Sequence, residues 1–233
     1  MAWRDTNTLC DERVIPLGTI NDYPQSPLLI RQQLEEYEGL GTGMSFHLQD
    51  PSLTHPMHLC IYTLSCLGST LWAGAMVSIK YLEHRFSPKA HDTVPYETRM
   101  NGVRVLELGC GTGAVGLACA RLGAEVLLTE QAQLSPLIHH NIAAAKSNQS
   151  HLEAKHTITF QSFDWGESGI SAQTRFGSQP YDLVVASDCI VPRLYDPALF
   201  FECLDHVCWS PVTEAVVVVE YRLTSHSCIY IYI

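Results

Sequence analysis

The chain has 233 residues, of which 46% are apolar and 16% are charged, which is typical of one globular α/β domain with an N-terminal extension and excludes a disordered chain. The formal net charge is −10 without a basic stripe, which argues against nucleic-acid binding. Such a charge suits a basic partner, for instance a lysine-bearing protein surface, although solubility alone explains it equally well.

The nine cysteines are scattered and odd in number and form no C-x-x-C pair, so they indicate a reduced protein of the cytoplasm or the nucleus. No apolar run approaches about 18 residues and no apolar signal region opens the chain, so neither a membrane span nor secretion is expected. His55, His58 and Cys60 lack a second ligand pair at zinc spacing, so we expect no metal site.

Residues 1–64 are interpreted as an N-terminal extension and residues 65–233 as the main domain. Prolines and glycines interrupt the extension, which we expect to form loops, with room for a hairpin and a short helix near Arg31–Tyr37. The stretch Gly39–Gly43 is interpreted as a turn and not as a phosphate loop, because no strand precedes it and no Gly-Lys-Ser/Thr follows.

The main domain begins with a helix whose apolar face recurs between Ser69 and Phe86, with Ser69 or Thr70 as a plausible cap. The pairs Ser135-Pro136 and Asp196-Pro197 signal two further helix starts, each as an N-cap followed by a first-turn proline. Strands and helices alternate from Val103 onward, which predicts a Rossmann-like, doubly wound and mostly parallel α/β sheet with helices on both faces. The expected strands are 103–108, 124–129, 157–160, 181–187 and 215–220, and the expected helices are 114–122, 136–146 and 197–208.

A glycine turn, Gly109-Cys110-Gly111-Thr112-Gly113, joins the first of these strands to its helix. Backbone N–H groups at such a helix start meet a ligand without a Cβ in the way. Gly111, Gly113 and Gly116 also satisfy the dinucleotide fingerprint G-x-G-x-x-G. Glu107 favours another ligand, because the pattern Glu-x-Gly-x-Gly-x-Gly resembles motif I of the class I S-adenosylmethionine (SAM) methyltransferases, whose turn wraps the methionine end of SAM.

Three more segments end at the same edge of the predicted sheet. Glu130 ends the second strand, where an acid can accept hydrogen bonds from both ribose hydroxyls; the alternative is a solvated strand end. Asp164 and Trp165 follow the third strand, where a carboxylate and an aromatic ring suit adenine, although such a pair is more often a packed turn. Asp188 ends the fourth strand and should face the transferring methyl group or the incoming nucleophile, unless it caps a helix.

In combination, four segments resemble the protein-lysine methyltransferases of family 16, the methyltransferase-like 21 group. The resemblance covers residues 65–222 and implies that SAM is lined by Trp72, Gly109 to Gly111, Glu130, Trp165 and Ser187. Trp72, otherwise a plain core residue, thereby becomes part of the expected cofactor wall. The segments are Leu71-Trp72-Ala73 through Lys80-Tyr81-Leu82-Glu83, Leu106 to Gly113, Asp164-Trp165-Gly166, and Ala186-Ser187-Asp188-Cys189.

The chain departs from this family pattern in two places. The family has an aromatic residue three positions after the strand-end acid, where this chain has Val191; Tyr195 is the candidate replacement in the lysine channel. Thirteen residues follow Glu220, enough for one short strand where the family continues with a helix and two strands. We therefore expect the main domain to be incomplete at its C-terminus, with an exposed apolar strand edge.

The sequence predicts a SAM-dependent methyltransferase that acts on a lysine ε-amine of a protein. Catalysis is then chiefly in-line positioning of the amine, which Asp188 would orient or deprotonate through water. Three alternatives stay open. The overlapping glycines support an NAD-dependent oxidoreductase, Val191 and the short C-terminus support an inactive SAM-binding or interaction protein, and the acceptor can also be a small molecule.

Overall fold

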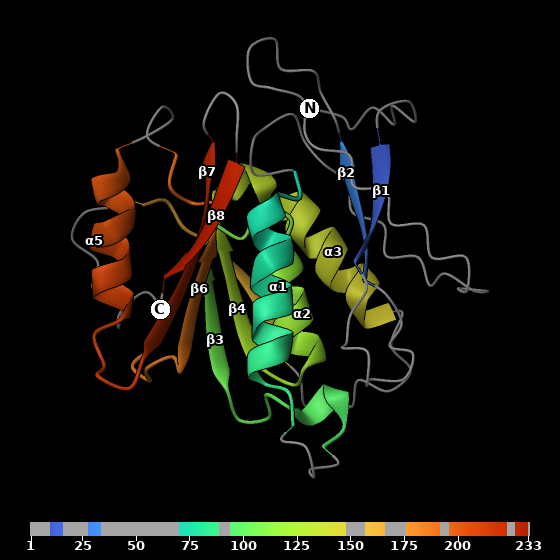
Figure 1. The fold of residues 1–233 in the computed structure, drawn as a ribbon, viewed down its shortest axis with the longest axis horizontal. Coiled ribbons are helices and arrows are strands. Elements are labelled where there is room, and N and C mark those ends of the chain that lie inside the picture. The colour runs from blue at the N-terminus through green and yellow to red at the C-terminus, as the bar shows by residue number, and fades with distance from the viewer. Residues whose placement is uncertain are drawn as a thin grey trace.

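The structure is a computed structural model that describes residues 10–15, 28–33, 70–88, 94–147, 157–165, 176–191, 196–222 and 227–232. Six strands form one sheet in the order β5-β4-β3-β6-β7-β8 (Figure 1). The first five are parallel to one another, and β8 pairs antiparallel with β7. The predicted α/β, mostly parallel sheet is confirmed. The strands are β3 (Arg104–Leu108), β4 (Glu125–Glu130), β5 (Ile158–Ser162), β6 (Leu183–Ser187), β7 (Glu214–Arg222) and β8 (Ser227–Tyr232).

Helices cover both faces of this sheet (Figure 1). Three helices lie on one face: α1 (Ala73–Arg85), α2 (Ala114–Arg121) and α3 (Ser135–Ser147). They pack on the strand side chains that point to this face, such as Val105 and Val216. On the other face, α5 (Pro197–Val207) packs on the intervening positions such as Leu106 and Val217. Alternate residues of a strand point to opposite faces, so a doubly covered sheet needs apolar residues at consecutive positions.

Of the predicted helix N-caps, the one of α5 is confirmed, and those of α1 and α3 are wrong. Asp196 is the N-cap of α5, and its carboxylate accepts a hydrogen bond from the N–H of Ala198, as the Asp-Pro signal predicts. The prediction for Ser135 is wrong, because a short 3-10 turn over Ala132–Leu134 runs directly into α3 and leaves Ser135 with helical dihedral angles. The predicted cap of α1 is wrong as well, because that helix begins later, with Trp72 in the N-cap position.

Helix α1 is held at its C-terminal end by polar contacts. The hydroxyl of Tyr96 donates to the buried carboxylate of Glu83 at 2.5 Å, and Lys80 donates to the same carboxylate at 2.7 Å. Arg85 forms an ion pair with Glu214 at the start of β7. These contacts fix the helix against the sheet at the edge opposite the glycine turn, so its N-terminal end projects toward that turn.

The N-terminal strands form a separate two-stranded sheet. Strands β1 (Cys10–Ile15) and β2 (Leu28–Gln33) pair antiparallel, which agrees with the predicted hairpin. The helix predicted near Arg31–Tyr37 is wrong over Arg31 to Gln33, because these residues continue β2, where the register places Arg31 opposite Glu12 of β1. The remainder of that helix and the Gly39–Gly43 turn lie outside the described residues.

Strand β7 lies between β6 and β8 in the sheet. Val216, Val217 and Val218 are buried, as expected for a strand covered on both faces. Strand β8 forms one edge of the sheet, where Tyr232 is 59% exposed, and the prediction of one short strand from the tail is confirmed. In the described part of the chain, no helix combines the length and the apolar character that a membrane span requires.

Candidate functional site

The glycine turn lies at the carboxyl end of β3, between the parallel strands β4 and β6. Gly109, Gly111 and Gly113 have φ angles of +62°, +53° and +78°, which L side chains rarely adopt. Gly113 is the N-cap of α2, whose residues are all buried except Arg121. A glycine-rich turn with left-handed backbone therefore lies at the edge of the sheet where open α/β folds bind ligands.

Glu130 supports this turn from the end of β4. The backbone N–H of Gly111 donates to its Oε2 at 2.8 Å, and the N–H of Gln131 donates to its Oε1 at 2.9 Å. Burial raises the pKa of the Glu130 carboxyl, the two N–H groups lower it, and the nearby charge of Asp164 raises it. The predicted ribose acid thus already orders the turn, with lone pairs left over for a hydroxyl donor.

Glu107 lies behind the turn rather than at its open side. Its side chain is 2% exposed, and its Oε2 accepts a hydrogen bond from the N–H of Gly116 in α2 at 2.7 Å. Burial raises the pKa of Glu107 to about 8, while that hydrogen bond lowers it and the charge of Glu130 raises it. A Cβ at Gly116 would overlap Leu128 and lie 2.7 Å from the Glu107 carboxylate. This glycine therefore serves the close packing of α2 on the sheet.

Two side chains press against Gly109. An added Cβ there would lie 2.8 Å from both Cζ2 of Trp165 and Sγ of Cys189, closer than Cβ atoms approach other atoms. Trp165 also packs edge-on against Phe200 of α5, with ring centroids 5.2 Å apart. The indole is therefore fixed beside the turn, while Asp164 next to it is exposed.

Asp188 connects three elements at the carboxyl end of β6. Its Oδ2 accepts a hydrogen bond from the N–H of Gly74 in α1 at 2.9 Å, and its Oδ1 accepts one from the N–H of Glu220 in β7 at 2.8 Å. Its φ is +55°. The carboxylate thus acts as a helix cap, in the way the alternative interpretation of this residue expects, and the cap is supplied by a distant strand rather than by the helix's own sequence.

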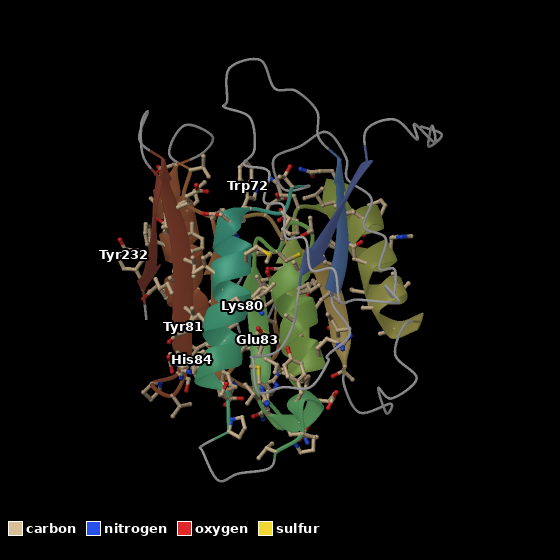
Figure 2. All side chains as sticks on the ribbon, turned by 45° about the vertical axis from the view of Figure 1, so that its right-hand side comes forward. Trp72, Lys80, Tyr81, Glu83, His84 and Tyr232 are labelled. Atoms are coloured by element: carbon tan, nitrogen blue, oxygen red, sulfur yellow. The ribbon has the colours of Figure 1, made fainter. Side chains whose placement is uncertain are left out.

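This cap brings Trp72 to the site. Trp72 is half-buried in the N-cap position of α1, immediately before the turn that Asp188 holds. Figure 2 shows Trp72 at the N-terminal end of the helix, with Lys80, Glu83 and His84 following toward the opposite end. The structure therefore brings together Trp72, Asp188, the half-buried Ser187 and the glycine turn at one edge of the sheet. Tyr195 lies outside the described residues.

Two residues of this site escape sequence interpretation. Gly74 is one, because its contact with Asp188 spans 114 sequence positions and leaves no local pattern. Asn141 is the other: it lies in α3, is 0% exposed, and donates from Nδ2 to the backbone oxygen of Thr112 in the glycine turn at 2.8 Å. A polar residue on the apolar face of a predicted helix is the signal that could reveal it. Within the described ranges, no group of His, Cys, Asp and Glu is arranged to hold a metal ion.

Comparisons with known proteins agree with this geometry. A family model described as lysine methyltransferase matches residues 54–227. The protein-lysine methyltransferase METTL21E of Mus musculus is 26% identical over 145 residues, covering 61% of this chain and 52% of that protein. The protein N-lysine methyltransferase METTL21A of Danio rerio is 27% identical over 145 residues, covering 60% and 56% respectively. The chain thus spans about half the length of the curated relatives it matches.

Among solved structures, precorrin-6y C5,15-methyltransferase from Geobacter metallireducens aligns with a TM-score of 0.42 and 15% sequence identity. The alignment covers 71% of this chain and 70% of that one.

Proposed function

Because the chain belongs to the lysine methyltransferase family, we propose that it binds SAM and transfers its methyl group to a lysine ε-amine of a protein substrate. The observation that carries this proposal is the left-handed glycine turn between β3 and α2, held by Glu130 at Gly111. Both residues meet at the sheet edge where open α/β folds bind nucleotide-containing ligands.

The residues present fit SAM. The glycines let the turn adopt its left-handed backbone, and beside it Glu130 presents a carboxylate for the ribose hydroxyls. Trp165, with Asp164 beside it, offers an aromatic face and an acceptor for the adenine. Trp72, in the N-cap position of α1, is our candidate for a second aromatic wall. When bound, SAM supplies an electrophilic methyl group on its sulfonium.

On the acceptor side, the chain must present a neutral amine to that methyl group. A free lysine has a pKa near about 10.4, and a partly apolar channel lowers it by disfavouring the charged ammonium. The carboxylate of Asp188 already accepts two backbone N–H groups, so we assign it chiefly to holding α1 and β7 around the channel. Tyr195 remains our candidate for the aromatic wall, since Val191 cannot supply one.

We further propose that the protein works in the cytoplasm or the nucleus without a nucleic-acid partner. The reduced thiols support the compartment: Cys110, Cys119, Cys189, Cys203 and Cys208 are free in the structure. The net charge of −10 supports a basic protein surface as the partner and disfavours nucleic acid.

Calorimetry on the whole chain tests the cofactor, with SAM and NADH as separate titrants. We expect binding of SAM in the micromolar range or tighter and none of NADH; the reverse result would overturn the proposal and favour the oxidoreductase. Incubation with tritiated SAM and fractionated cell lysate then tests the acceptor. Label in protein that amino-acid analysis recovers as methyllysine is expected, whereas label only in small molecules would refute the protein substrate.

A further inference from the structure

We infer that Asn141 is a positioning residue of the cofactor site, which fixes the glycine turn in the conformation that receives the ligand; this inference rests on the proposed function. Its Nδ2 donates to the backbone oxygen of Thr112 at 2.8 Å, and both residues are buried, at 0% and 3% exposure. The contact joins the middle of α3 to the turn across 29 positions of sequence.

The turn needs this support because neither a helix nor a sheet holds its central peptide groups. Gly111 and Gly113, on either side of Thr112, both have positive φ angles and a large conformational freedom to lose on folding. A buried carbonyl such as that of Thr112 must find a donor, and Asn141 supplies it. Without that donor, the buried carbonyl of Thr112 is unsatisfied, and this turn conformation loses stability relative to its alternatives.

Asn141 acts together with Glu130. Glu130 accepts from the N–H of Gly111, and Asn141 donates to the carbonyl of Thr112, so the two side chains hold opposite ends of one dipeptide. Both come from the continuous segment that leaves β4 and forms α3. The segment that contains Glu130, the proposed ribose ligand, therefore also fixes the shape of the turn. In this way the parts of the site that would bind the ribose and the methionine of SAM keep a fixed position relative to each other.

A role in packing alone does not account for this residue. The neighbouring buried positions of α3 are apolar, Leu137, Ile138 and Ile142. The Oδ1 atom of Asn141 is buried and has no hydrogen-bond partner among the described residues. A buried acceptor without a partner destabilises the fold, so a position that serves packing alone is better filled by an apolar side chain. The Nδ2 donor is the feature that an apolar residue cannot replace.

The test compares Asn141→Leu, which removes the donor at similar volume, with Ile142→Ala, which weakens the packing of α3 but leaves the Thr112 carbonyl its partner. We expect SAM to bind about tenfold more weakly to the Leu variant and equally well to the Ala variant, measured by calorimetry below the unfolding transition of each. The backbone N–H of Gly113, which donates to Cys110, should also exchange with solvent faster in the Leu variant without SAM.

A third variant, Asn141→Asp, restores a donor only when the acid is protonated. The ratio of its SAM dissociation constant to that of the parent should fall as the pH is lowered, while the same ratio for Asn141→Leu stays constant. Equal SAM affinity and equal exchange in parent and Leu variant would overturn the inference. If the parent binds no SAM, the proposed function fails, and the Gly113 exchange rates still decide whether Asn141 fixes the turn.

Discussion

The carboxylate of Asp188 accepts a hydrogen bond from the backbone N–H of Gly74, joining the end of β6 to the first turn of α1 at 2.9 Å. The N-terminal N–H groups of a helix lack partners within the helix, and α1 has no side-chain cap of its own. Asp188 satisfies one of these groups from outside. The position of Trp72 at the site therefore depends on this contact.

Gly74→Ala should displace this helix. An added Cβ would overlap Oδ2 of Asp188 and lie 2.7 Å from its Cγ, so one of the two elements must move. We expect a loss of about 1–3 kcal/mol in stability, measured by urea unfolding, together with weaker SAM binding. In the double variant with Asp188→Ala the overlap disappears, so the two losses should be clearly less than additive. Additive losses would contradict the contact.

Asp188→Asn should lower stability as well as turnover. The amide keeps one acceptor oxygen, but its NH2 group then faces the N–H of Gly74 or Glu220, which costs about 1–3 kcal/mol in folding free energy. Asparagine tolerates the φ of +55° at this position, so backbone strain is not the cause. The melting temperature and the rate of methyl transfer should both be lower than in the parent. A variant with the parent's melting temperature and reduced turnover would instead assign Asp188 to the chemical step.

Gly109→Ala and Gly102→Ala form a matched pair. Both glycines have positive φ angles, +62° and +79°, but a Cβ at Gly102 meets nothing within 4 Å. The Gly102 variant therefore measures the backbone cost alone, about 1–2 kcal/mol, and should bind SAM normally. The Gly109 variant also pushes on Trp165 and Cys189, so we expect a larger loss of stability and no measurable SAM binding by calorimetry. Similar behaviour of the two variants would show that the packing at Gly109 is unimportant.

The raised pKa of Glu107 predicts how stability depends on pH. The folded protein keeps the proton of this carboxyl up to about pH 8, whereas the unfolded chain loses it near its ordinary pKa of 4.5. The stability that the folded protein gains from holding this proton is therefore fully present below pH 4.5 and is lost as the pH rises toward 8. Glu107→Gln, which keeps an acceptor for Gly116, should flatten the fall of the melting temperature between pH 5 and pH 8. The pKa of Glu130 is also raised, so this residue lowers the stability in the same way as the pH rises. The melting temperature of Glu107→Gln should therefore still fall with pH, but less steeply than that of the parent. An equal slope in parent and variant would contradict the assignment.

The parts of the fold that follow from local sequence were predictable. The strands are short runs of consecutive apolar residues, the glycines from Gly109 to Gly113 recur at every second position, and the start of α5 follows from Asp196 and the proline after it. The boundaries shifted where local signals competed, as at Ser135, where a 3-10 turn extends the helix backward. Arg31 continues a strand because a partner strand, Cys10–Ile15, supplies its hydrogen bonds, and a single segment does not reveal its partner.

The candidate site divides in the same way. Glu130 and Trp165 could be placed beside the turn because parallel strands end at one edge of a sheet. The bonding of Asp188 to Gly74 and Glu220, and of Asn141 to Thr112, depends on tertiary packing between segments 29 to 114 positions apart. Sequence patterns locate such residues on an element, but the element's rotation and depth decide which backbone group each side chain meets.

Trp165 touches the glycine turn at Gly109 on one side and Phe200 of α5 on the other. Its indole is thus an intrinsic fluorescent probe of the contact between the glycine turn and α5. Ligand-induced changes in its fluorescence would be read against Trp209, which is 43% exposed and lies after α5. A chain in which the other three tryptophans are phenylalanine would report on this contact alone, without an added label.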